Sequence, residues 1–179
     1  MLIHVRAACI TPTDVAFARG ELSDITGRPT PRPARVLGTV CAGTVEVAGS
    51  RASVAFPRGA NVVAIVPLVG PRSVGVCAEF TAADVSACVP LPEKLSFEQA
   101  AAAAYAGTTA LEILHGKLKL TPGDVMLVTD AASLLGSVLA QLATRLYKVA
   151  VIAAVYSVEE ADYLASLPDA VKPCLFFFL

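Results

Sequence analysis

The stretch from Val128 to Ser137, VTDAASLLGS, has the composition of a loop that leads from a strand into a helix. A loop that binds the pyrophosphate of a dinucleotide brings phosphate oxygens against backbone N–H groups at a helix N-terminus, so side chains there must be small or absent. Of a three-glycine spacing only Gly136 is present, and Asp130 and Ser133 occupy the other two positions. The stretch fits a phosphate-binding loop, and it fits equally a helix entry with a small residue for close packing.

Asp130 bears on the choice between these interpretations because it places a negative charge beside any bound polyphosphate. A like-charge pair at about 4–6 Å in a medium of intermediate dielectric weakens binding about a hundredfold or more. This cost is avoided if Asp130 points away from the phosphates or caps the helix.

A second polar position, Ser157, follows the next apolar run along the chain. Its hydroxyl is a candidate hydrogen-bond partner for a 2′-phosphate on an adenosine ribose. Such a phosphate favours a cation or a fork of donors, yet the next charged residues are Glu159 and Glu160, with Lys148 as a possible substitute cation. The two acidic residues also fit ordinary charges at a helix N-terminus, and this is the interpretation we favour.

The elements that position these residues follow from the apolar pattern. Apolar runs at 125–129 and 149–155 predict strands buried on both faces, and helices are expected at 131–146 and 159–167. Residues 174–179 are a possible start of a third strand. This β-α-β-α order is the first part of a doubly wound parallel sheet.

The first hundred residues predict a compact β barrel or sandwich. Alternating, branched-residue runs predict strands at 2–8, 36–47, 61–68, 75–81 and 87–91, with turns at 27–33, 57–59 and 67–71. Ser96 and Gln99 then form a capping-box pattern at the start of a helix that runs to about Ala104, and a second helical segment is expected at 108–117. A turn is expected at Pro122–Asp124.

Composition limits the function classes. The 179 residues carry a net charge of −1, with 16% charged and 55% hydrophobic residues, which excludes intrinsic disorder. The absence of a basic cluster argues against nucleic acid as a partner. A mean hydropathy of +0.66 raises the question of a membrane span. The best candidate, 125–143, is interrupted by Asp130 and other polar residues, so we expect no span.

Five cysteines, at positions 9, 41, 77, 88 and 174, show no CxxC pair and no disulfide-scaffold density. They fit buried thiols in a reducing compartment, and we expect a cytoplasmic protein. Cys9 and Cys41 lack a nearby histidine, whereas catalytic zinc needs at least three protein ligands. We therefore expect no zinc or other metal site.

The strings from Ala78 to Leu114 and from Leu120 to Ala143, together with 5–14 and 36–50, resemble the zinc-free quinone oxidoreductase branch of the medium-chain dehydrogenase/reductase superfamily. The resemblance implies an α/β fold, in which a GroES-like β domain precedes a Rossmann-type doubly wound parallel sheet. It places an incomplete GroES-like domain at 1–107 and a partial dinucleotide-binding domain at 108–179. It also implies reduction of a quinone or enone by hydride from NADPH.

The resemblance assigns coenzyme contacts to the backbone of Ser133, Leu134, Leu135 and Gly136, with Ser157 near the adenosine ribose. On the substrate side it points to Thr11 and Asp14, in the stretch TPTD, and to Tyr105 near the domain junction. Family members often have Asn-Pro-x-Asp followed by Tyr there. A turn with Asp14 as a helix cap explains TPTD equally well, and a core role explains Tyr105.

Family members are nearly twice as long as this chain, so the resemblance implies truncation at both ends. An incomplete sheet exposes an edge and an apolar face, which favours a homo-oligomer or a subunit of a larger assembly. The truncation and the replacement of two loop glycines by Asp130 and Ser133 leave two hypotheses open. The protein is an NADPH-dependent quinone or enone oxidoreductase, or it is a catalytically inactive truncated relative, a pseudoenzyme or isoform, that acts as a binding or structural subunit.

Overall fold

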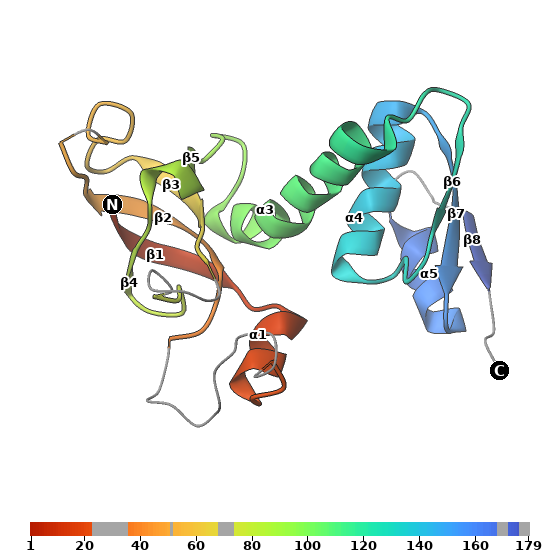
Figure 1. Cartoon of the computed structure of the whole chain (residues 1–179), viewed down its shortest axis with the longest axis horizontal. Coiled ribbons are helices and arrows are strands. Elements are labelled where there is room, and N and C mark those ends of the chain that lie inside the picture. The colour runs from red at the N-terminus through yellow and green to blue at the C-terminus, as the bar shows by residue number, and fades with distance from the viewer. Residues whose placement is uncertain (23–35, 51, 68–73, 168–171, 176–179) are drawn as a thin grey trace. The chain divides into compact units, whose positions relative to one another are not determined.

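The computed structural model describes residues 1–22, 36–50, 52–67, 74–167 and 172–175, and it divides into two compact units, Met1–Tyr105 and Ala106–Leu179 (Figure 1). In chain order its elements are β1 (Leu2–Cys9), α1 (Pro12–Ala18), β2 (Val40–Val47), β3 (Asn61–Ile65), β4 (Phe80–Ala82), η1 (Val85–Ala87), β5 (Cys88–Pro90), α3 (Phe97–Leu111), η2 (Glu112–Leu118), β6 (Val125–Val128), α4 (Leu134–Leu142), η3 (Ala143–Tyr147), β7 (Ala150–Val155), α5 (Val158–Ser166) and β8 (Lys172–Leu175). The predicted turn at 27–33, most of that at 67–71 and residues 176–179 lie outside the described residues.

The first unit is built on an antiparallel sheet with strand order β4-β1-β2-β3-β5. β1 and β2 pair along their whole lengths, with register shifts of the β-bulge type. The predicted β-rich first part of the chain is confirmed, although its strands are shorter than expected. β2 begins at Val40 rather than at residue 36, because Gly38 has a φ of +86°, which a strand does not adopt.

Each face of this sheet packs against an apolar cluster, as strand alternation requires. One cluster includes Ile3, Val45 and Val62, and the other includes Ala42 and Val63. Alanines of the first turns of α3 complete the second cluster, so the start of α3 covers that face of the sheet.

The start of α3 has the predicted capping box. The Gln99 N–H donates to Ser96 Oγ at 3.2 Å, and the Ser96 N–H donates to Gln99 Oε1 at 3.0 Å. The predicted interruption between residues 104 and 108 is wrong, because α3 is continuous from Phe97 to Leu111. Gly107 costs a helix only about 0.5–1 kcal/mol relative to alanine, which is less than breaking the ladder of backbone hydrogen bonds would cost.

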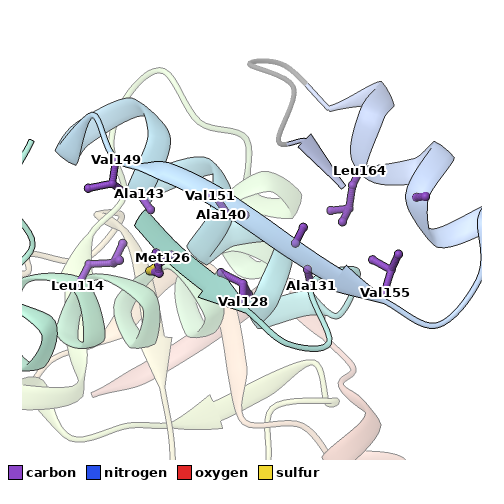
Figure 2. Packing of buried hydrophobic residues seen from close by; sticks show 12 residues of the cluster. Leu114, Met126, Val128, Ala131, Ala140, Ala143, Val149, Val151, Val155 and Leu164 are labelled. Carbon is purple, nitrogen blue, oxygen red and sulfur yellow. The ribbon is translucent and has the colours of Figure 1, made fainter. Parts of the chain in front are cut away.

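The second unit contains a parallel sheet with strand order β6-β7-β8 (Figure 1). Val128 of β6 and Val151 and Val155 of β7 lie in one cluster with residues of α4 and α5, including Leu164 (Figure 2). The predicted order of strands and helices is confirmed. The segments η2 and η3 are π-helical and both end at a lysine with left-handed backbone, Lys119 with a φ of 50° and Lys148 with a φ of 56°.

The expectation that these strands are buried on both faces is wrong. Val125 and Leu127 are 64% and 58% exposed, and Ile152 of the neighbouring strand is exposed as well. The alternate residues of β6 and β7 are buried against the helices. The strands are apolar on both faces, but the described residues cover only one.

The stretch considered as a membrane span, 125–143, is divided into β6, a loop, α4 and the first residue of η3. Among the described residues, no helix has both the length and the apolar character needed to cross a bilayer.

Candidate functional site

The loop between β6 and α4 lies at the carboxyl end of the parallel sheet, where doubly wound folds bind their ligands. Within this loop, Asp130 has a φ of 51° and so adopts the left-handed conformation that glycine favours. The Ala131 N–H donates to the Ala154 carbonyl of β7 at 3.1 Å, and the Ser133 N–H donates to the Asp130 carbonyl at 3.0 Å. The first bond ties the loop to β7, and the second closes a turn within the loop.

Gly136 lies in the first turn of α4, where the helix passes very close to this loop. A Cβ at that position would be 2.3 Å from the Asp130 carbonyl oxygen and 2.8 Å from the Ala131 Cα. Both are backbone atoms, which cannot move aside as a flexible side chain does. Glycine is required here for the close approach of the helix to the loop.

Ser133 is the N-cap of α4, and its Oγ accepts the Gly136 N–H at 3.1 Å. Leu134 and Leu135 begin the helix, and the Leu134 side chain is partly exposed. A helix of this length presents the positive end of its dipole at its N-terminus. The short loop, the helix start and Gly136 fit a pyrophosphate.

Ser157 lies at the corresponding end of β7 and is the N-cap of α5. Its Oγ accepts the Glu160 N–H at 3.2 Å. The backbone N–H of Glu159, and then the nearby Ser157 hydroxyl, lower the pKa of the Glu159 carboxyl. The Tyr156 N–H donates to Glu160 Oε2 at 2.8 Å.

Lys148 does not supply the cation that a 2′-phosphate would need beside Ser157. It precedes the first residue of β7, whereas Ser157 follows the last, and the six residues of the strand separate them by about 20 Å. A 2′-phosphate at this end of β7 would therefore be bound without Lys148.

Thr11 and Asp14 are brought together at the start of α1. The Thr11 N–H and hydroxyl donate to Asp14 Oδ2 at 2.8 and 2.7 Å, and the Asp14 N–H donates to Thr11 Oγ1 at 3.4 Å. Both side chains are buried, with exposures of 7% and 1%. Asp14 Oδ1 is also buried and has no hydrogen-bond partner among the described residues. The pair forms a complete capping box, as the turn-and-cap interpretation of TPTD supposes.

Two thiols lie near this pair: Cys9, which precedes Thr11 by two positions, and Cys77, which sequence reasoning did not connect with it. Burial and the Asp14 carboxylate, in that order, raise the pKa of Cys9 and of Cys77. Cys77 is 63 positions from Asp14 in the sequence, so no local pattern could have indicated the proximity. Among the described residues, no group of three His, Cys, Asp or Glu side chains could hold a metal ion.

Tyr105 is on α3 and is 47% exposed. Each unit of the chain holds one of the two groups of candidates. The substrate-side candidates Thr11, Asp14 and Tyr105 belong to the first unit. The coenzyme-side candidates, the loop before α4 and Ser157, belong to the second unit.

Comparison with known proteins gives a consistent result. The family model of the alcohol dehydrogenase GroES-like domain matches residues 1–118. The chloroplastic NADPH-dependent alkenal/one oxidoreductase of Arabidopsis thaliana is 34% identical over 170 residues, which cover 93% of this chain and 42% of that protein.

Two solved structures are similar over nearly the whole chain. A mycobacterial protein complexed with NADPH matches with a TM-score of 0.76 and 28% identity, covering 100% of this chain and 50% of that one. The quinone oxidoreductase of Pseudomonas syringae matches with a TM-score of 0.77 and 27% identity, covering 96% and 49%. The chain spans about half the length of these proteins. Its antiparallel first unit, its parallel second unit and these similarities show that the chain belongs to the medium-chain dehydrogenase/reductase superfamily, with an alcohol dehydrogenase GroES-like domain at residues 1–118.

Proposed function

We propose that this protein is an oxidoreductase that uses a nicotinamide dinucleotide to reduce an enone, an alkenal or a quinone. The observation that carries the proposal is the loop at the carboxyl end of β6, where Gly136 allows the helix to pass within contact distance of the Asp130 backbone. The relatives support it, because one is named for NADPH-dependent reduction of alkenals and enones, one is a quinone oxidoreductase, and one was solved with NADPH.

In this proposal the second unit binds the adenosine half of the coenzyme. The backbone of Ser133 to Gly136 faces the pyrophosphate, and the end of β7 at Ser157 faces the adenosine ribose. The nicotinamide ring would supply the hydride. Thr11, Asp14 and Tyr105 remain predicted substrate-side residues, and the capping box indicates that Asp14 acts by holding Thr11 in place.

The proposal also concerns the oligomeric state of the protein and its cellular compartment. The exposed apolar face formed by Val125, Leu127 and Ile152 supports a homo-oligomer or a subunit of a larger assembly. Among the described residues, Cys9, Cys41, Cys77 and Cys88 are free thiols, which supports a reducing compartment such as the cytoplasm.

The test is calorimetric titration of the purified chain with reduced nicotinamide dinucleotides, on the wild type, Asp130→Gly and Asp130→Asn. Glycine and asparagine both tolerate a left-handed backbone, so both variants remove the charge without straining the loop. We expect micromolar binding that tightens in both variants, because each removes a negative charge beside the phosphates. A screen of quinones and enones as acceptors follows.

Other outcomes separate the two hypotheses left open by the sequence. Binding by the variants alone, with no acceptor reduced by the wild type, would favour the catalytically inactive relative. Absence of binding by all three proteins would overturn the proposed coenzyme site.

A further inference from the structure

The two segments that lead into β6 and β7 expose cationic and leucine side chains at the same end of the parallel sheet. Residues 117–119 have the sequence KLK, and residues 145–148 have the sequence RLYK. β6 and β7 are neighbouring parallel strands, and the Ala150 N–H donates to the Asp124 carbonyl at 3.0 Å. Both segments therefore lie at one end of the second unit, opposite the loop between β6 and α4 (Figure 1).

Leu118 and Leu146 lie outside the apolar core of this unit. They are 47% and 60% exposed, whereas Leu120 and Tyr147 pack against the apolar cluster beside the sheet. One exposed leucine is ordinary on a protein surface, but each of these two has a cation directly before it in the sequence and another one or two positions after it. Exposed leucines among lysine and arginine are the combination with which interfacial segments enter the headgroup region of a bilayer.

Among the described residues, cations outnumber carboxylates in these segments and in the turn between them and the strands. The exposed charged residues there are Lys117, Lys119, Arg145 and Lys148, together with Glu112 and Asp124. Glu112 begins η2, whereas the lysines lie at its end. The Asp124 carboxylate is engaged within its own turn, because it accepts the Thr121 N–H and hydroxyl at 2.8 and 3.0 Å. The excess of positive charge favours an anionic partner.

Two of these cations occupy positions that would suit glycine better. Lys119 and Lys148 have left-handed backbone, with φ of 50° and 56°, which is costly for a residue with a side chain. Each ends a π-helical segment and follows an exposed leucine by one or two positions. The chain thus keeps a lysine at the end of both segments at a conformational cost, which indicates a role for the two side chains.

We propose that this end of the second unit binds the surface of an anionic membrane. The amino-end surface consists of Lys117, Leu118, Lys119, Arg145, Leu146 and Lys148. The cations contact negatively charged headgroups, and the leucines enter the boundary between headgroups and acyl chains. A soluble polyanion such as a nucleic acid would use the cations and leave the leucines exposed, so the leucines favour lipid. The proposal does not depend on the proposed function.

Vesicle flotation of the purified chain tests the proposal, because bound protein rises with the lipid. One set of vesicles is phosphatidylcholine alone, and in the other about a third of the lipid is phosphatidylserine. Two double variants accompany the wild type: Lys119→Asn with Lys148→Asn, and Leu118→Gln with Leu146→Gln. Asparagine tolerates the left-handed backbone, and glutamine has a helix propensity close to that of leucine.

Each double variant has a matched control in the first unit. Arg6→Gln with Lys94→Gln removes two exposed positive charges outside the amino-end surface. Val47→Thr with Val54→Thr removes exposed apolar surface there. Circular dichroism confirms that each variant is folded.

We expect the wild type to bind vesicles that contain phosphatidylserine about tenfold or more tightly than phosphatidylcholine vesicles, with an affinity that falls as salt rises. Each double variant of the amino-end surface should lose about tenfold or more in affinity for the anionic vesicles. The lysine variant loses charge, and the leucine variant loses apolar contact with lipid. The two controls should bind as the wild type does.

Three results would overturn the proposal. The first is absence of wild-type binding to both kinds of vesicle, and the second is equal binding to the two kinds. The third is a control that weakens binding as much as the variant it matches. A leucine variant that keeps wild-type affinity for anionic vesicles, with wild-type binding of a single-stranded oligonucleotide in solution, would assign the surface to nucleic acid instead. None of these results bears on the proposed oxidoreductase activity.

Discussion

Gly136 is the residue whose identity the structure restricts most directly in the candidate site. Gly136→Ala would place a Cβ 2.3 Å from a backbone oxygen of the loop. Because backbone atoms must shift to relieve this contact, we expect the free energy of unfolding to fall by about 2–3 kcal/mol. Urea denaturation followed by circular dichroism measures the change.

Gly107→Ala is the matched control for this substitution. Gly107 is also helical, and no atom lies within 4 Å of where its Cβ would be. Removing a glycine from a helix interior should raise the free energy of unfolding by about 0.5–1 kcal/mol. If the two variants changed stability in the same direction, the close approach at Gly136 would be refuted.

The cysteines of the first unit differ in their reactivity. Burial, and then the neighbouring Cys88 and Cys77, raise the pKa of the Cys41 thiol to about 12. Since the thiolate is the reactive form, only about one Cys41 in ten thousand is reactive at pH 8. Cys77 has a raised pKa as well, but its side chain is exposed.

Iodoacetamide at pH 8 should therefore modify Cys77 well before Cys41 in the folded protein. Peptide mass spectrometry over a time course measures both rates, and the difference should vanish in urea. Equal rates for the two residues under native conditions would contradict the buried position of Cys41.

Among the elements, those encoded by local patterns were predictable. The reciprocal capping at Ser96 and Gln99 depends on four neighbouring residues, and the order of strands and helices after residue 120 depends on apolar periodicity. The predicted break in α3 was wrong because Gly107 weakens a helix without ending it. The prediction that β6 is buried on both faces was wrong because an apolar pattern shows that a face can be buried and does not show what buries it.

An aspartate stabilises the turn that leads into β6, and it should make the stability of this unit depend on pH. The Thr121 N–H and hydroxyl donate to Asp124 Oδ2 at 2.8 and 3.0 Å and lower the pKa of this carboxyl below its ordinary value of 3.8. A carboxyl whose pKa is lower in the folded state stabilises the fold above its unfolded pKa, and this contribution is lost as the pH falls through the folded pKa.

The stability difference between the wild type and Asp124→Asn should consequently be present at pH 6 and shrink below about pH 4. Thermal unfolding between pH 2.5 and pH 6 measures it, with Asp162→Asn as a matched loss of charge. A difference that stayed constant over this range would contradict the role given to the Asp124 carboxylate.

At the scale of the whole molecule, the candidate site was predictable only where it is continuous in sequence. The loop at 128–137 could be placed because strand, turn and helix follow one another. The contact of the Glu160 carboxylate with the Tyr156 N–H depends on the direction of a side chain, which spacing does not determine. The proximity of Cys77 to Asp14 depends on contacts between segments that are distant in the sequence.

The exposed face of the parallel sheet should make the protein associate at high concentration. Val125 and Leu127 lie on one face of β6, which is one of the two end strands among the described strands of its sheet. The double variant Val125→Thr and Leu127→Thr keeps β propensity at position 125 and removes apolar surface at both positions. We expect it to sediment with less dependence on concentration and to bind less of a hydrophobic dye.

Val54→Thr is the control for this variant, because Val54 is 91% exposed and is outside this face. It should behave as the wild type does in sedimentation. Unchanged association of the double variant would show that the face does not drive it.

Lys119 and Lys148 are two positions at which substitution should raise the melting temperature of the protein. Each holds a left-handed backbone, which costs a residue with a side chain roughly 1–2 kcal/mol, at the amino ends of the strands and away from the candidate site. Glycine at both positions removes this strain and loses part of the gain to the entropy of the unfolded chain. Scanning calorimetry of the double variant Lys119→Gly with Lys148→Gly should show a melting temperature a few degrees higher than that of the wild type. Coenzyme binding should be unchanged. The thermal stability of the chain can therefore be raised without altering its coenzyme binding.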